Sequence, residues 1–161
     1  MISVGIDVSK EKSTICILKP YGEIVCNPFE VQHVEAELAS LDSMLSKLDD
    51  EIKIVMEATG VYHLPILTFF HEKGYFISVI NPFAMKKYAK NNSIRGAKTD
   101  KLDSITIANY GIEKWFKLQK YEGDEENYAE LQQVLSDFRF QLYRRTSDWN
   151  LYPLWKGKLC R

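Results

Sequence analysis

The order of strand-like and helix-like segments constrains the fold of this chain more than any other feature. Three strand-like segments come first, at 2–7, 13–18 and 23–29, and are separated by short turns. In the first of them Ile2, Val4 and Ile6 alternate with small or polar residues and Asp7 ends the run, as in a strand with one buried face. Strands joined by short turns pair antiparallel. We therefore expect the chain to open with a three-stranded antiparallel meander.

Helices and strands then alternate. A helix is expected at 33–48, a strand at 52–56, a helix at 61–73 and a strand at 75–80. The helix at 61–73 contains Pro65, which is tolerated only in a first turn, so we expect it to begin later than its pattern. The segment 75–80 is almost wholly apolar, which predicts a central parallel strand covered on both faces. This order predicts an α/β domain built on a mixed sheet with flanking helices.

Two more helices are expected, at 83–89 and 100–112, on either side of a polar loop at 91–99. Asn81 and Pro82 end the strand before them. On the second helix, steps of three and four residues place Leu102, Ile105 and Ile112 on one side and Asp100, Asp103, Ile107 and Tyr110 on the other. The two carboxylates of this helix therefore share a face.

The segment 81–103 combines a concentration of positive charge with two carboxylates. Its cationic residues are Lys86, Lys87, Lys90, Arg95, Lys98 and Lys101, and Asp100 is the only acid before Asp103. The whole chain has a formal net charge of -1, so this charge is local. Such a segment suits a site that binds a polyanion and performs metal-assisted chemistry on it. The alternative is a solvated charged loop followed by Asp100 as a helix N-cap.

Four acids occupy positions that a divalent-metal site would use. Asp7 and Glu57 each end an apolar strand, and Asp100 and Asp103 share a helix face. Mg²⁺ prefers oxygen ligands, and two-metal phosphoryl transfer requires carboxylates from several elements. Each acid also has an ordinary alternative role, as a turn residue at Asp7, a strand-end charge at Glu57, or helix N-terminal residues at Asp100 and Asp103. From the residues alone, both interpretations stay open.

The three cysteines are odd in number and widely spaced, at Cys16, Cys26 and Cys160, with no CxxC pair. Together with the absence of a signal-peptide pattern, this favours a cytoplasmic protein over a disulfide framework. The histidines form no zinc-binding spacing, and no apolar run is long enough to span a bilayer. A secreted or membrane protein is therefore not expected.

The last part of the chain is expected to differ from the domain at 1–120. A connector helix is predicted at 121–145, with an apolar stripe of Tyr128, Leu131, Leu135, Phe138 and Leu142. Such a stripe is typical of a core face or a coiled-coil seam, and an exposed seam favours a homo-oligomer. The tail at 146–161 follows no period.

Four motifs of this sequence resemble those of one known family. They read GIDVSK at 5–10, EATGVY at 57–62, NPFAMKKYAK at 81–90 and RGAKTDKLDS at 95–104. In this order and spacing they resemble the N-terminal domain of the DEDD-type transposases of the "one-ten" insertion-sequence family, which includes the Piv-type DNA invertases. The resemblance covers about residues 2–135. It implies an RNase H-like, RuvC-related fold whose C-terminal helix starts a coiled-coil connector.

The resemblance also implies a chemistry. Asp7, Glu57, Asp100 and Asp103 would be the catalytic acids that bind Mg²⁺, with Mn²⁺ as an alternative. Arg95, Lys98 and Thr99 would support the site or contact phosphate, together with the neighbouring lysines. Enzymes of this family cut and rejoin DNA during transposition, guided by a structured RNA transcribed from the element.

The sequence also departs from the family. A second, C-terminal domain of the family carries a serine nucleophile, and the resemblance fades beyond about Tyr143 in a tail that looks truncated or out of frame. No serine here is assigned that role, so we do not expect complete strand exchange from this chain alone. Two alternatives stay open, namely a stand-alone, structure-selective nuclease of the resolvase type and a non-catalytic nucleic-acid-binding fragment. A sugar-kinase or actin-like ATPase is disfavoured because no Gly-rich phosphate-binding segment is present.

Overall fold

The computed structural model describes residues 1–91 and 99–123. The chain divides into two units, Met1–Glu122 and Gly123–Arg161, and the first of them contains every element described below. The elements are β1 (Ile2–Val8), β2 (Lys12–Leu18), η1 (Pro20–Gly22), β3 (Ile24–Gln32), α1 (Glu35–Leu45), β4 (Ile52–Glu57), α2 (Leu64–Glu72), β5 (Phe76–Ile80), α3 (Pro82–Asn91), α4 (Asp100–Glu113) and η2 (Trp115–Lys117). The apolar stripe predicted for the connector helix and the tail at 146–161 lie outside the described residues.

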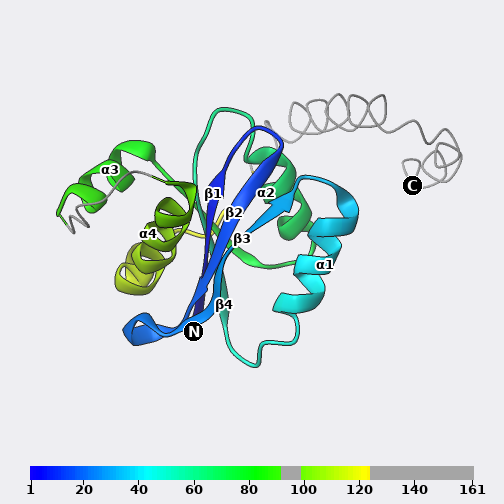
Figure 1. The fold of residues 1–161 in the computed structure, drawn as a ribbon, viewed down its shortest axis with the longest axis horizontal. Coiled ribbons are helices and arrows are strands. Elements are labelled where there is room, and N and C mark those ends of the chain that lie inside the picture. Colours follow the sequence, from blue (N-terminus) through cyan, green and yellow to red (C-terminus); the bar gives the residue numbers. More distant parts are fainter. Residues whose placement is uncertain (92–98, 124–161) are drawn as a thin grey trace, which may run out of the picture. The chain divides into compact units, whose positions relative to one another are not determined.

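The strands form one mixed sheet in the order β3-β2-β1-β4-β5. β1, β2 and β3 pair antiparallel, as predicted, whereas β1, β4 and β5 run parallel to one another. Helices α1 and α2 cover one face of this sheet, and α3 and α4 cover the other (Figure 1). The predicted mixed sheet with flanking helices is therefore confirmed.

The predicted position of the apolar segment 75–80 within the sheet was wrong. This segment forms β5, which is an edge strand and not a central one. Both of its faces are nevertheless covered, because Ile77 belongs to the core under α1 and α2, whereas Ile80 packs with Met85 on the other face. The amide of Tyr121 also donates a hydrogen bond to the carbonyl of Ile77, at 2.7 Å. An apolar run reports burial of the two faces and carries no information about strand neighbours.

Several predicted boundaries also move by a few residues. β3 continues to Gln32, and α1 begins at Glu35 and not at His33. α2 begins at Leu64, which leaves Pro65 in its first turn, as its geometry requires.

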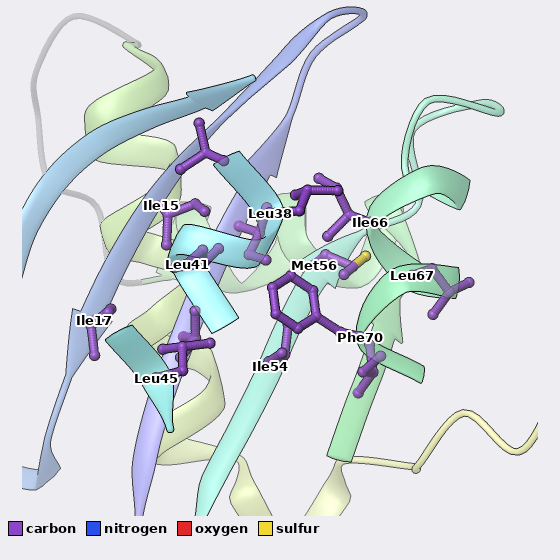
Figure 2. Packing of buried hydrophobic residues seen from close by; sticks show 14 of the residues in the cluster. Ile15, Ile17, Leu38, Leu41, Leu45, Ile54, Met56, Ile66, Leu67 and Phe70 are labelled. Carbon is purple, nitrogen blue, oxygen red and sulfur yellow. The ribbon is translucent and has the colours of Figure 1, made fainter. Parts of the chain in front are cut away.

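The main core lies between the sheet and helices α1 and α2. Leu38, Leu41 and Leu45 project from α1, and Phe70 from α2, onto Ile54 and its strand neighbours (Figure 2). These leucines recur at steps of three and four residues and form the buried face of α1. None of the described helices is long and apolar enough to cross a membrane.

A buried histidine makes the stability of this domain depend on pH. His33 is 4% exposed, its Nε2 atom lies 2.9 Å from the hydroxyl of Ser13, and burial lowers its pKa from 6.5 to about 4. Below pH 6.5 the unfolded chain binds a proton that the folded chain does not, so stability is lost as the pH falls from 6.5 to about 4.

We expect the free energy of unfolding to fall by roughly 3 kcal/mol across this window. Urea unfolding at a series of pH values measures this loss. In His33→Gln the free energy of unfolding should no longer fall by this amount between pH 6.5 and about 4. This expectation holds even if the variant is more or less stable than the wild-type chain. An unchanged slope in His33→Gln would refute the assignment.

Candidate functional site

Asp7 and Glu57 lie side by side at the same end of neighbouring strands. β1 and β4 run parallel, and Ile6 pairs with Met56. Continuing this register by one residue brings Asp7 level with Glu57, on strands about 4.8 Å apart. Both carboxylates are half-buried. They therefore share one edge of the sheet, where parallel strands end.

These two carboxylates also share a face of the sheet. Ile6 and Met56 belong to the core under α1 and α2, so the next residue on each strand points to the opposite face. This is the face that α4 covers. Asp7 is also the cross-strand neighbour of Thr14, a buried residue of β2.

Helix α4 packs very closely onto β1. A Cβ atom added to Gly5 would overlap the backbone nitrogen of Ala108 and the carbonyl oxygen of Ser104. One turn further along the helix, a Cβ atom on Gly111 would overlap the hydroxyl of Ser3. Small residues on both elements therefore allow the helix backbone to approach the strand.

The register of these contacts brings the first turn of α4 to the end of β1. Ser3 of β1 lies against Gly111 of α4, whereas Gly5, two residues further along the strand, lies against Ser104 and Ala108. The contacted helix residues therefore have lower numbers as β1 advances, so the helix runs antiparallel to β1. A step of two residues along a strand covers about 6.6 Å, and a helix needs between about four and five residues to cover the same distance. A further step from Gly5 to Asp7 therefore reaches the level of Asp100 and Asp103. The backbone thus carries all four predicted acids to one end of the sheet.

The N-cap of α4 is Thr99 and not Asp100. The Thr99 hydroxyl accepts a hydrogen bond from the amide of Leu102, at 3.3 Å. Asp100 is the first residue of the helix and is exposed, and Asp103 is half-buried. The alternative in which Asp100 caps the helix is therefore wrong, and its carboxylate is not engaged in capping.

The predicted basic residues lie on α3, on α4 and in the segment that joins these two helices in the sequence. Lys86, Lys87 and Lys90 are exposed on α3, and Lys101 is exposed in the first turn of α4. Arg95 and Lys98 lie outside the described residues. Thr99 acts as the cap described above.

The donor set suits a hard divalent metal, although its side chains are not gathered around a common point. Four carboxylates supply only oxygen ligands, which Mg²⁺ and Mn²⁺ prefer. Across residues 1–91 and 99–123, no three His, Cys, Asp or Glu side chains converge closely enough to hold a metal ion. The backbone positions and the donor chemistry fit such an ion, and the side chains would have to turn towards it.

Sequence reasoning missed the residues that set the helix against the strand. Ser104, Ala108 and Gly111 recur at steps of four and three and form the buried centre of α4. The apolar sets that the sequence indicated pack on either side of this centre, with Ile105 on one flank and Ile107 on the other. The spacing of the small residues could have indicated a helix face able to approach another backbone closely, but not that β1 is its partner.

Comparison with known proteins gives a match to a family model over most of the chain. The model is that of the DEDD transposases of the IS110 type, described as "Transposase", and it matches residues 4–150. This match continues past Tyr143, where we expected the resemblance to fade, so that expectation was wrong for the residues up to 150.

Two curated relatives share the same segment. The pilin gene-inverting proteins of Moraxella lacunata and Moraxella bovis are each 28% identical to this chain over 123 residues. The alignment covers 76% of this chain and 38% of each relative. The chain thus aligns with well under half the length of these relatives.

Solved structures with a similar fold include RuvC of Thermus thermophilus. It superposes with a TM-score of 0.52 at 13% identity, covering 74% of this chain and 99% of RuvC. T. thermophilus RuvC in complex with a Holliday junction substrate gives a TM-score of 0.53 at the same identity and coverage. At this level of identity the likeness establishes the RuvC-like fold alone.

Proposed function

The chain belongs to the DEDD transposases of the IS110 family, and we propose that its unit Met1–Glu122 is the metal-binding domain that cuts DNA strands in transposition. Asp7, Glu57, Asp100 and Asp103 hold the metal. Two observations support this proposal. The β1–β4 register ends beside Asp7 and Glu57, and the close contact of Gly5 with α4 directs the first turn of that helix towards the same end of the sheet.

The residues of the proposed site have separate tasks. Asp7 and Glu57 provide ligands from a rigid backbone, since each is part of a strand of the central sheet. Asp100 and Asp103 come from the first turn of a capped helix, whose dipole favours their negative charge. Divalent ions bound there supply charge that stabilises the attacking and leaving oxygens of a phosphodiester displacement.

The proposed substrate is DNA. The names of the relatives describe gene inversion, and the RuvC structure contains a Holliday junction. We assign phosphate contacts to the exposed lysines Lys86, Lys87, Lys90 and Lys101, and to Arg95, Lys98 and Thr99 as the motif resemblance implies. The proposal also includes a structured guide RNA, which follows from the family resemblance. It further includes self-association through the segment 128–142, which follows from the apolar stripe.

A titration of Mg²⁺ or Mn²⁺ into the purified chain, with and without branched DNA, tests this function. The wild-type chain should bind the ion, and Asp100→Asn/Asp103→Asn should weaken binding roughly 100-fold, since even partners of metal ligands contribute about 10- to 100-fold. Asp49→Asn is the matched control, because Asp49 is an exposed acid between α1 and β4. Equal affinity of the double variant and the control would refute the proposal.

The same titration separates a transposase domain from a stand-alone nuclease. Metal binding without nicking of the branched DNA supports a domain that acts together with other parts of the transposase. Metal-dependent nicking that is lost in Glu57→Gln supports a nuclease of the resolvase type. Absence of metal binding by the wild-type chain would exclude both.

A further inference from the structure

One face of α3 carries an aromatic and basic stripe that packs against nothing in the described part of the chain. Met85 and Tyr88 hold the helix against the sheet and α4, where Tyr88 makes an edge-to-face contact with Tyr110. With about 100° of rotation per residue, the side opposite Met85 and Tyr88 is occupied by Phe83, Lys86, Lys87 and Lys90, which lie within an arc of about 100°. We call these four residues the α3 stripe.

Phe83 is the unusual member of this stripe. Its side chain is 78% exposed, although a Phe side chain would normally be buried in a core. The helix packs through other residues, so Phe83 contributes nothing to the hydrophobic clusters of the domain. An exposed aromatic ring beside lysines suits a ligand that offers both a flat apolar surface and negative charge.

The charge of the stripe is of one sign. α3 contains no acidic residue, and none of its three lysines forms an ion pair with a described carboxylate. From Phe83 to Lys90 the stripe extends about 10 Å along the helix, a length that matches a few nucleotides of a polynucleotide backbone.

The stripe begins beside the candidate metal site. Glu57 pairs with Ile80 at the end of β5, and the carboxamide of Asn81 accepts a hydrogen bond from the amide of Phe83, at 2.8 Å. This bond fixes the first turn of α3 at the end of the sheet where Glu57 lies. A strand bound along the lysines would therefore have its Phe83 end close to the carboxylates.

We propose that the α3 stripe binds single-stranded DNA, with one unpaired base stacked on Phe83 and the backbone phosphates on Lys86, Lys87 and Lys90. In a duplex the faces of the bases are covered by their neighbours, so only an unpaired base offers a face to the Phe83 ring. The inference rests on the proposed function in one respect, that the polynucleotide is DNA. An acidic peptide would use the lysines but not the flat ring, and it is the competing occupant in the test.

The test measures binding of short oligonucleotides to the full chain in the presence of a chelator. Phe83→Ala should weaken the binding of single-stranded DNA by about 5- to 100-fold, the contribution of one stacked base. Binding of the same sequence as a duplex should change less than about twofold. Phe83→Trp should restore the single-strand affinity, and 2-aminopurine in the oligonucleotide should report the stacking as fluorescence quenching.

Phe116→Ala is the matched control. Phe116 is also an exposed phenylalanine, at 63%, but it lies in η2 after the C-terminal end of α4. It should leave single-strand binding unchanged. Lys87→Ala should lower the slope of log affinity against log salt concentration by about 0.7, as expected for one lost phosphate contact.

Four results would overturn the proposal. The first is an unchanged affinity of Phe83→Ala for single-stranded DNA, and the second is an equal loss of affinity in Phe83→Ala and Phe116→Ala. The third is an equal loss of affinity of Phe83→Ala for single-stranded and duplex DNA. The fourth is binding that depends on Phe83 with RNA or an acidic peptide but not with DNA. The chelator separates this test from the metal titration. A chain that binds metal through its carboxylates but binds DNA independently of Phe83 would retain the proposed function and lose this inference.

Discussion

Gly5→Ala is expected to lower the free energy of unfolding by about 3 kcal/mol, at the upper end of the range for overpacked cores. The new Cβ atom would overlap backbone atoms of Ala108 and Ser104, which cannot rotate away. Helix α4 must therefore move off the strand. Because Asp100 and Asp103 belong to this helix, metal affinity should fall at least tenfold in the same variant. Chemical unfolding and metal titration measure the two effects.

Gly22→Ala is the control for this variant. Gly22 has a φ of 77° and no atom within 4 Å of an added Cβ, so the substitution introduces backbone strain without overlap. It should cost about 1–2 kcal/mol and leave metal affinity unchanged. Gly5 has no positive φ, so its requirement for glycine comes from the packing of α4 alone. A Gly5→Ala chain as stable as Gly22→Ala, with unchanged metal affinity, would refute this account.

Asp7→Asn is expected to abolish the stabilisation of the fold by Mg²⁺ or Mn²⁺. A metal ion that binds only the folded chain raises the free energy of unfolding by about 2.7 kcal/mol at a concentration of 100 times its dissociation constant. Asparagine keeps the shape of the side chain but removes the charge from the strand end beside Glu57. Urea unfolding with and without metal measures the difference between the two chains.

Asp49→Asn again serves as the control and should keep the full stabilisation by metal. The comparison is made at one ion concentration, so general effects of salt act equally on every variant. If Asp7→Asn gains as much stability from the ion as the wild-type chain, Asp7 is not a ligand. The proposed site would then have to be drawn without it.

Much of the fold was predictable because periodicity reports burial directly. Ile2, Val4 and Ile6 alternate as a strand with one buried face requires, and the leucines of α1 recur at helical spacing. The wrong position of β5 in the sheet has the same origin. Its apolar side chains are covered on both faces, as in a central strand, although β5 is an edge strand whose Ile77 carbonyl accepts a hydrogen bond from the amide of Tyr121. The face on which a side chain lies can therefore be predicted, whereas the lateral order of strands cannot.

The candidate site was predictable to a lesser degree. The four acids were predicted from their positions at strand ends and on a helix, together with the motif resemblance, and their role as metal ligands stays a prediction. Phe83 was not identified, because a Phe side chain is normally buried, whereas α3 packs through Met85 and Tyr88 and leaves Phe83 exposed. Thr99 as the true N-cap of α4 was also missed, since Thr and Asp are both common in that position.

The sequence by itself determined the local structure and the chemical groups of this domain: which segments are strands or helices, which faces are apolar, and which carboxylates and lysines are present. These properties depend on neighbours along the chain. The tertiary structure alone decided that β1 lies beside β4, and that α4 approaches Gly5 closely enough to bring Asp100 and Asp103 to the level of Asp7. These contacts join residues far apart in the sequence, and their register depends on packing between backbones, which no local pattern encodes.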